Sequence, residues 1–455
     1  MNSFVRFVLE NGGSDYDLMY PQSIFKRKYC TSNTSCVWFN NELIINTRLV
    51  EYIKLFQNDN IRVLTSENYT QTYFYTKNGF NSRNIMSKFS DGTLCDTIET
   101  IYPDSTYWDC YYRGLEDGRL VVWNDKLYIY GTRWDRVEDK GCICIYELDE
   151  NMQPFNEIIV HPQGSGNCEK NWGAVEDRPF TFVYCNNPTD IVQVNERGDC
   201  WLVKSNGKNE NITKAIKGST QIVRYDDNTY ISMVHTNDWH VKGEFSYSDY
   251  LTAFVFYDND LNIIKMSDWF VFKAPMCEFT CGMAIKGDDV YITYSQLDCT
   301  SSILITNKDT INKFVDLHED LNNTYGFIDY YQIAKFFENN NQFMSAYGLY
   351  NYALTLNDNN PIYREIEIEC LIKMLCGVIK QCGDFRKKTY YNEIKERINY
   401  YISKYPEVCE LYYLYSYICK VEQNLAESNM YKQMGDERKL NIHKYFFKYF
   451  NSNYL

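Results

Sequence analysis

The sequence predicts a mostly β fold over residues 1–320, a five-bladed β-propeller, followed by an all-α region over residues 321–455. Up to about residue 318, apolar and polar residues alternate with a period of two, which is typical of strands with one buried face. Beyond that point apolar residues recur every three or four positions, which is typical of packed helices. A chain of 455 residues that is 45% hydrophobic can form two domains, each with its own core.

The β region repeats one pattern: an apolar strand, a turn rich in Asn or Asp, and an alternating strand rich in Tyr, Val and Ile. It is clearest over residues 115–135, where Asn124-Asp125 form the tight turn of a hairpin. Five copies are present, over residues 37–49, 115–135, 173–184, 221–234 and 283–294. Their turns lie about 50 to 84 residues apart, which is too far for isolated hairpins and suits four-stranded blades. The repeat therefore predicts a five-bladed propeller.

Residues 115–135 also place an acid between two arginines. Glu116, Asp117 and Arg119 lie on the first strand of the hairpin, and Arg133 lies on the second. A carboxyl group can move the proton on a glycosidic oxygen, and arginine can bind phosphate through two parallel hydrogen bonds. The pattern favours a pocket for a sugar and a phosphate. Alternatively, Asp117 is a turn carboxylate, and the two arginines form structural ion pairs between blades.

Further segments follow in a recognisable order. They are Asn33-Thr34-Ser35, Asn46-Thr47-Arg48, Glu169-Lys170-Asn171-Trp172, residues 231–235, Tyr250, residues 279–285, residues 288–294 and Asp298. Together with residues 115–135 they resemble the inverting mannoside phosphorylases and related mannosyltransferases, which share a five-bladed propeller. The resemblance spans roughly residues 20–310. It implies an enzyme that transfers a mannosyl-like hexosyl unit between a glycan and a phosphate-bearing donor, as a phosphorylase or as a transferase.

The resemblance also implies a role for each candidate site residue. Asp117 is implied as the catalytic acid. Phosphate or donor binding is implied for Arg119, Arg133, Lys170 and His235. Sugar binding is implied for Arg48, Glu116, Asn171, Trp172, Tyr250, Cys281 and Asp298. The expected ligands are an oligosaccharide or other glycan together with phosphate, a sugar phosphate or a sugar nucleotide, and neither a metal nor another cofactor is expected.

The chain departs from the family pattern at three places. Gly118 replaces a proline in the acid segment, and Thr34 replaces one in the opening segment. Residues 185–188 stand where phosphorylases usually show His-Arg-Pro. If that histidine and arginine hold inorganic phosphate, their loss favours a relative that uses another phosphate-bearing donor. A glycan-binding propeller without catalysis and a protein-interaction scaffold remain as alternative functions.

Charge and cysteine content exclude several classes of protein. A net charge of −14, a pI near 5.0 and the lack of basic clusters argue against nucleic-acid binding. No apolar stretch is long enough for a membrane span, and the N-terminus has no apolar segment of signal-peptide length. The 17 cysteines include no Cys-x-x-Cys pair, which favours reduced thiols used as small hydrophobic residues. We therefore expect a cytoplasmic protein.

The helical region begins with residues at tetratricopeptide spacing. They are Tyr330, Ile333, Ala334, Phe337, Ala346, Tyr350 and Ala353. Further helices are expected over residues 362–380, 390–404, 408–421 and 439–445. A short solenoid of this kind either binds a protein partner or a second copy, or braces the propeller. The tyrosines between residues 412 and 417 would supply exposed aromatic surface for such contacts.

Overall fold

Two units of the chain are distinguished by their internal contacts in the computed structural model. The first comprises Met1–Glu51, Asn78–His240 and Ser248–Tyr325, and the second comprises Tyr52–Lys77, Val241–Tyr247 and Gly326–Leu455. The predicted boundary between residues 320 and 321 falls in a stretch outside the described residues. The structure describes residues 3–21, 30–50, 52–55, 72–75, 82–102, 114–135, 140–162, 168–210, 212, 214–242, 245–317, 324–356, 360–383 and 388–438.

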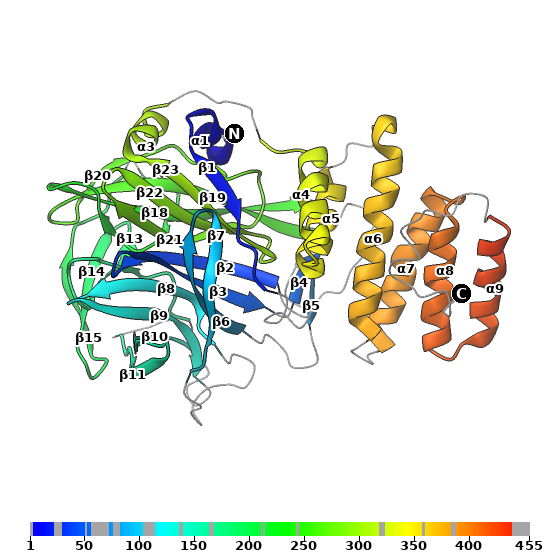
Figure 1. Ribbon diagram of the computed structural model, residues 1–455, viewed down its shortest axis with the longest axis horizontal. Coiled ribbons are helices and arrows are strands. Elements are labelled where there is room, and N and C mark those ends of the chain that lie inside the picture. Colours follow the sequence, from blue (N-terminus) through cyan, green and yellow to red (C-terminus); the bar gives the residue numbers. More distant parts are fainter. Residues whose placement is uncertain are drawn as a thin grey trace. The chain divides into compact units, whose positions relative to one another are not determined.

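The first unit is a five-bladed β-propeller, as predicted, built from antiparallel sheets (Figure 1). Blade 1 consists of β2 (Cys30–Phe39), β3 (Glu42–Val50), β6 (Ser82–Ser90) and β7 (Thr93–Thr100). Blade 2 consists of β8 (Glu116–Trp123), β9 (Lys126–Asp135), β10 (Lys140–Leu148) and β11 (Pro154–Ile159). Blade 3 consists of β12 (Gly173–Ala174), β13 (Thr181–Asn186), β14 (Thr189–Val194) and β15 (Cys200–Ser205).

Blades 4 and 5 differ from the others in the strands that form their edges. In blade 4, β18 (Thr229–Lys242) pairs with both β16 (Lys217–Gly218) and β17 (Val223–Arg224), and β19 (Phe245–Asp258) and β20 (Ile263–Met266) follow. Blade 5 consists of β21 (Glu278–Lys286), β22 (Asp289–Gln296), β23 (Thr300–Asn307) and β1 (Ser14–Asp17). The most N-terminal strand thus pairs with β23, which closes the ring of blades by main-chain hydrogen bonds.

Among the described residues of the propeller, five apolar clusters each join two neighbouring blades. Between blades 2 and 3, for example, Trp123 and Tyr130 pack with Trp172 and Phe182. Two helices, α1 (Phe4–Glu10) and α3 (Lys308–Val315), extend the cluster between blades 4 and 5. Burial of large aromatic and aliphatic side chains at these junctions stabilises the ring.

The predicted hairpins are confirmed at their turns. Asn40 and Asn41 have φ values of 49° and 63°, and Asn124 and Asp125 have values of 50° and 59°. Two successive residues with positive φ match the right-handed twist of the flanking strands, and Asn and Asp tolerate this conformation best. The local turn chemistry therefore sets the register of blades 1 and 2.

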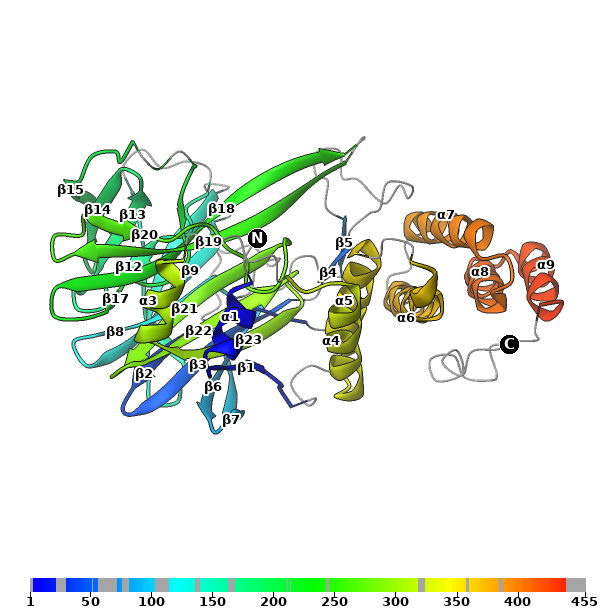
Figure 2. The same cartoon turned by 90° about the horizontal axis from the view of Figure 1, so that it is seen from above.

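The second unit is largely helical. It contains the hairpin of β4 (Tyr52–Leu55) and β5 (Thr72–Tyr75), and then α4 (Phe327–Asn339), α5 (Phe343–Leu356), η1 (Pro361–Tyr363), α6 (Arg364–Gly383), α7 (Lys388–Lys404), α8 (Cys409–Val421) and α9 (Leu425–Asp436). From α4 to α9 each helix packs against the next one (Figure 2). The helices expected over residues 362–380, 390–404 and 408–421 are confirmed as α6, α7 and α8, whereas residues 439–445 lie outside the described part of the chain.

Two details of the helices bear on the predicted solenoid. Ala334, Ala346 and Ala353 are completely buried, and α4 and α5 pack together. The expectation of exposed aromatic surface is wrong for Tyr412, Tyr413 and Tyr415, which are at most 6% exposed. The reason is that α9 covers them: the Tyr415 ring stacks on Tyr431 at 3.8 Å, and the Tyr413 hydroxyl donates to Asp436. No helix within the described ranges is long and apolar enough to cross a membrane.

Candidate functional site

Three neighbouring inner strands of the propeller carry a β-bulge. The register shifts between Ser32 and Ser35 on β2, between Glu116 and Arg119 on β8, and between Thr280 and Gly282 on β21. Strand β2 contacts both β8 and β21, so the bulged segments come from adjacent blades. A bulge leaves one residue unpaired and redirects its side chain. The candidate site is built on these bulges.

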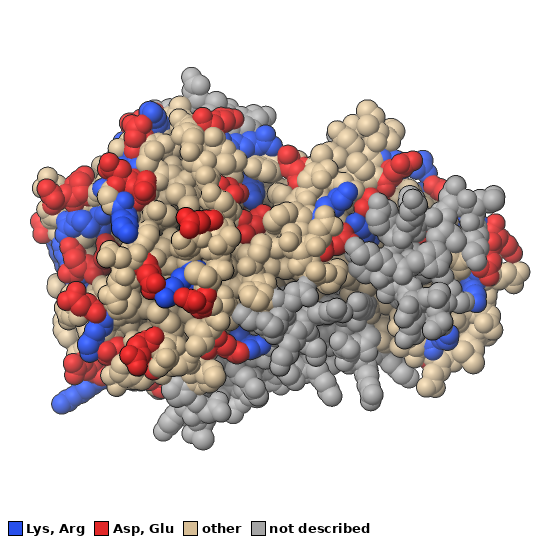
Figure 3. Space-filling view, viewed as in Figure 1, with Lys and Arg blue, Asp and Glu red and all other residues tan. Residues whose placement is uncertain are grey.

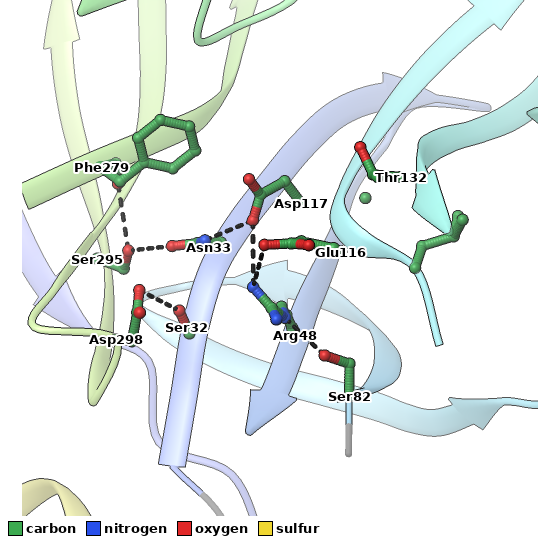
Figure 4. Close-up of polar contacts among 12 residues, drawn as sticks. Ser32, Asn33, Arg48, Ser82, Glu116, Asp117, Thr132, Phe279, Ser295 and Asp298 are labelled. Carbon is green, nitrogen blue, oxygen red and sulfur yellow. Dashed lines mark hydrogen bonds and ion pairs between the residues drawn. The ribbon is translucent and has the colours of Figure 1, made fainter. Parts of the chain in front are cut away.

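The carboxyl group of Asp117 lies at the centre of the site, as Figure 4 shows. Asp117 has φ 53° and Asn33 has φ 40°, a conformation that Asp and Asn adopt more readily than other side chains. Asn33 Nδ2 donates to Asp117 Oδ1 at 2.5 Å, and Asn33 Oδ1 accepts from Ser295 Oγ at 2.7 Å. Within the described residues no hydrogen bond reaches Asp117 Oδ2. Oδ1 is thus fixed by two residues of blade 1, whereas Oδ2 makes no hydrogen bond to a described residue.

Arg48 connects the two adjacent carboxylates of β8. Its Nη1 lies 3.4 Å from Asp117 Oδ1 and 3.6 Å from Glu116 Oε1, and its Nε donates to Ser82 Oγ at 2.8 Å. The Arg48 side chain is only 4% exposed, whereas that of Glu116 is 31% exposed. Arg48 therefore neutralises the buried side of the acid pair, as its contacts with both carboxylates show (Figure 4). Glu116 is partly exposed to solvent.

Asp298 and Cys281 lie on blade 5. Asp298 Oδ1 accepts from Ser32 Oγ at 3.1 Å, which places this second carboxylate beside the bulge of β2. Cys281 is the bulged residue of β21 and is completely buried. Burial raises the pKa of its thiol, while the positive charge of Arg119 opposes that effect. Cys281 is therefore an uncharged group beneath the site with no exposed surface for a sugar.

Arg119 is placed differently from the prediction that it binds phosphate. It is 1% exposed, and all three nitrogens of its guanidinium donate to protein atoms. Nε donates to Ser219 O at 2.6 Å, Nη1 to Asp117 O at 3.0 Å, and Nη2 to Asn171 Oδ1 at 3.2 Å. Because it is buried and each of its nitrogens already donates to a protein acceptor, Arg119 fixes the backbone of Asp117 against blades 3 and 4 instead of presenting a charge to a ligand.

Arg133 and Trp172 are not brought to the site. Arg133 Nη1 donates to Tyr146 Oη at 2.6 Å and lies 3.4 Å from Glu157 Oε1, so it serves an ion pair in the outer part of its own blade. Its neighbour Thr132 faces the other way and donates to Glu169 O, as alternation along β9 requires. Trp172 is 1% exposed, belongs to the cluster between blades 2 and 3, and offers no ring face for sugar stacking.

Lys170 supplies an accessible charge beside the acid pair. It is exposed, and no hydrogen bond or ion pair joins its ammonium group to any residue the structure describes. Desolvation by the surrounding protein lowers the pKa of Lys170, but the nearby carboxylates of Glu116 and Asp117 outweigh this effect, and the net shift is upward. Asn171, the next residue, has φ 64° and accepts from Arg119. Of the predicted phosphate ligands, Lys170 has the most suitable geometry.

His235 and Tyr250 form the blade 4 side of the site. The two rings stack with centroids 5.6 Å apart, and His235 Nδ1 lies 2.8 Å from Ser219 Oγ. Burial, and then the positive charges of Lys217, Arg119 and Lys170, hold the pKa of His235 well below its usual value. The imidazole is therefore neutral at pH 7, so it can exchange a hydrogen bond with a ligand but contributes no charge.

Several residues of the site were not identified from the sequence. Asn33 occurs in the opening segment, but only the bulge shows that it points at Asp117. Ser82, Ser219 and Ser295 are separated from their partners in the sequence, and isolated serines carry no signal. Lys217 is directly opposite His235 in the β16–β18 pair, a position that depends on a two-residue strand.

Comparisons with known proteins give a likeness at low identity. No family model and no curated protein matches this chain. Among solved structures, a β-1,2-mannobiose phosphorylase from Listeria innocua is 13% identical with a TM-score of 0.43, over 67% of this chain and 99% of that one. A mannose phosphorylase from Leishmania mexicana in complex with phosphate is 11% identical with a TM-score of 0.39, over 70% and 96%. A glycosyl hydrolase from Bacteroides ovatus is 10% identical with a TM-score of 0.44, over 62% and 85%. Similarities of this size do not bear on activity.

Proposed function

We propose that this chain is a carbohydrate-active enzyme that transfers a mannosyl-like hexosyl unit between a glycan and a phosphate-bearing donor, with Asp117 as the acid or base. The observation that carries the proposal is the position of the Asp117 carboxyl group. Its Oδ1 accepts hydrogen bonds from Asn33 and Arg48, and its Oδ2 has no hydrogen-bond partner among the described residues. The exposed Lys170 lies nearby. The order of the family-like segments points to the same activity.

The chemistry of glycosyl transfer requires this combination of groups. Departure of the bridging oxygen through an oxocarbenium-like transition state requires a carboxyl group that handles the proton, which Asp117 Oδ2 would do. When the second reactant is a phosphoryl oxygen, cations take the place of a second catalytic carboxylate. Lys170 would hold the phosphoryl group, and the polar groups of Glu116, Asn171 and Asp298 would bind sugar hydroxyls. Tyr250, stacked on His235, offers an aromatic edge for the ring.

The segment that replaces His-Arg-Pro is relevant to the choice between phosphorylase and transferase. Asn186 Oδ1 accepts from Tyr257 Oη at 3.1 Å, and Asn187 Nδ2 donates to the carbonyl oxygens of Asn209 and Ile212. These side chains serve internal contacts and add no cation. Phosphate binding in this chain would therefore depend on lysines, a weaker arrangement than a bidentate arginine, and a donor with further contacts of its own, such as a sugar nucleotide, would compensate.

The substitution Asp117→Asn tests the catalytic role. It keeps the shape and the bond from Arg48 Nη1 and removes only the ionisable group, so turnover should fall by about 100-fold or more. Activity would be measured with β-mannosides and phosphate, with a hexose 1-phosphate and with a nucleoside diphosphate hexose. Asp125→Asn, in the exposed turn of the same hairpin, is the matched control and should keep full activity. More than about a tenth of the activity left in Asp117→Asn would rule out a general acid.

The same screen separates the alternative functions. Glycan binding without turnover by any of the three donor systems would identify a glycan-binding propeller that lacks catalysis. Absence of both binding and turnover would favour a protein-interaction scaffold.

A tetratricopeptide-like role for the helical unit is a second part of the proposal, supported by the complete burial of Ala334, Ala346 and Ala353. The protein is proposed to be cytoplasmic, since the described cysteines are free thiols and all but Cys95 and Cys168 are buried.

A further inference from the structure

We propose that Lys217, together with Lys170, forms a two-lysine anion site that binds the phosphoryl group of the donor next to Asp117. Lys217 belongs to none of the family-like segments. The inference rests on the proposed function for the identity of the donor, but the anion site itself can be tested without any turnover.

The backbone brings the two lysines together. Lys217 and Gly218 form β16 at the inner edge of blade 4, and Lys170 and Asn171 directly precede blade 3. A Cβ atom added at Gly218 would lie 2.3 Å from the carbonyl oxygen of Asn171, so these two segments are in direct backbone contact. Each lysine immediately precedes one partner of that contact. The glycine permits the close approach, which any other residue at position 218 would prevent.

Cross-strand pairing sets the direction of Lys217. It is directly opposite His235, so both side chains emerge from the same face of the sheet. His235 in turn lies beside Ser219, the residue whose carbonyl oxygen accepts from Arg119. Lys217 is exposed, and its Nζ donates to Asn237 Oδ1 at 2.9 Å, an uncharged partner. Lys217 is therefore an exposed ammonium group on the same face of the sheet as His235.

Electrostatics support an anion between the two lysines. Partial burial lowers the pKa of Lys217, and the positive charge of Lys170 lowers it further. Two ammonium groups that repel each other favour the binding of an anion, because the anion removes the repulsion and adds two attractions. A phosphoryl dianion has the right charge and several oxygens for two point donors. A neutral glycan would gain hydrogen bonds but no charge attraction from this pair, so Lys217 would favour the phosphorylated donor and leave the proton transfer by Asp117 unchanged.

Calorimetry on the full chain tests the site, with inorganic phosphate, a hexose 1-phosphate and a nucleoside diphosphate hexose as separate probes. Lys217→Met should weaken phosphate binding by about tenfold or more, as expected for a hydrogen bond between charged groups. Lys217→Arg should restore part of the loss. Lys208→Met is the matched control, because it removes the same charge from an exposed lysine whose Nζ lies 3.9 Å from Glu210 Oε2. It should bind phosphate as tightly as the wild type.

Titration of His235 by NMR gives a readout that does not depend on activity. Lys217→Met should raise the pKa of His235, because one of the charges that lower it is gone, whereas Lys208→Met should leave it unchanged. Addition of phosphate to the wild type should also raise it. In the calorimetry, the probe whose binding is weakened most by Lys217→Met identifies which phosphoryl compound is the donor.

The two proposals fail in different ways. If Lys217→Met binds phosphate with wild-type affinity, or if the wild type binds none of the three probes, the two-lysine site is wrong. If phosphate binding depends on Lys217 but no glycan is turned over in any arm, the anion site stands and the proposed transfer activity does not.

Discussion

Replacement of Arg119 by methionine should destabilise the propeller severely while leaving its surface unchanged. The buried guanidinium donates to the main-chain carbonyls of Asp117 and Ser219 and to Asn171, at 3.0, 2.6 and 3.2 Å. A hydrogen bond from a charged donor contributes roughly 1.5 to 3 kcal/mol, and a buried carbonyl left without a partner costs about 1 to 3 kcal/mol. Three bonds less the desolvation of the arginine give an expected loss of about 3 to 5 kcal/mol in the free energy of unfolding.

Urea unfolding at pH 7.5, followed by tryptophan fluorescence, would measure the loss. Arg83→Met is the matched control, because Arg83 makes a bidentate pair with Glu99 but its side chain is 22% exposed. That pair should contribute less than about 1 kcal/mol. Arg119→Lys keeps the charge but cannot reach all three acceptors, so it should fall between the wild type and Arg119→Met. A loss below about 1 kcal/mol for Arg119→Met would refute the structural role and restore Arg119 as a candidate phosphate ligand.

Three further predictions concern pH, thiol chemistry and domain structure. Because His235 stays neutral when folded but takes up a proton below about pH 6.5 when unfolded, the wild type should lose about 1.4 kcal/mol of stability between pH 7.5 and 5.5 through this group. His235→Asn should lack that part of the pH dependence. If urea unfolding shows that the free energies of unfolding of the wild type and of His235→Asn change equally between pH 7.5 and 5.5, the prediction is contradicted. Cys168 is exposed close to Lys170 and Glu116, so phosphate should slow its alkylation but not that of exposed Cys95, as followed by peptide mass spectrometry; equal protection of both would exclude a ligand near Cys168. A chain ending at Tyr325 should keep the β-sheet circular dichroism and a cooperative transition, because all five blades are built from residues before that point; loss of the transition would show that the propeller requires the helices.

The five hairpins were predictable because their information is local. Asn-Asn and Asn-Asp turns between alternating strands determine blade 1 and blade 2 without reference to the rest of the chain. The pairing of Ser14 with Ile305 was not predictable, since a four-residue strand with no apolar pattern finds its partner almost 300 residues away. The two-residue strand β16 has no sequence signal of its own, and helix α9 was missed because its apolar residues are few and two of them, Leu425 and Met430, are exposed.

The site was predictable in its composition but not in the orientation of its side chains. The order of the motifs identified Asp117, Lys170 and His235. In the structure Lys170 is close enough to both Asp117 and His235 to affect their electrostatics. Side chains alternate between the two faces of a strand, so their direction is normally predicted from this alternation. A bulge inserts one extra residue and shifts the alternation beyond it. Arg119 follows the bulge of β8 and points inward to the backbone of neighbouring blades, whereas Arg133 points to the outer strands of its own blade.

Backbone strain at the site is consistent with function and not with stability. The left-handed conformations of Asn33 and Asp117 carry some strain even though Asn and Asp tolerate them better than other side chains, and glycine would relieve it at either position. The bond between the two side chains offsets part of the strain, yet it also holds a carboxylate that is only 10% exposed next to a second carboxylate. A propeller needs neither feature, because its blades are held by the apolar clusters between them. The strained pair, with Arg48 and Arg119 dedicated to holding it, is best explained by a requirement for one carboxylate oxygen at a fixed place where three blades meet.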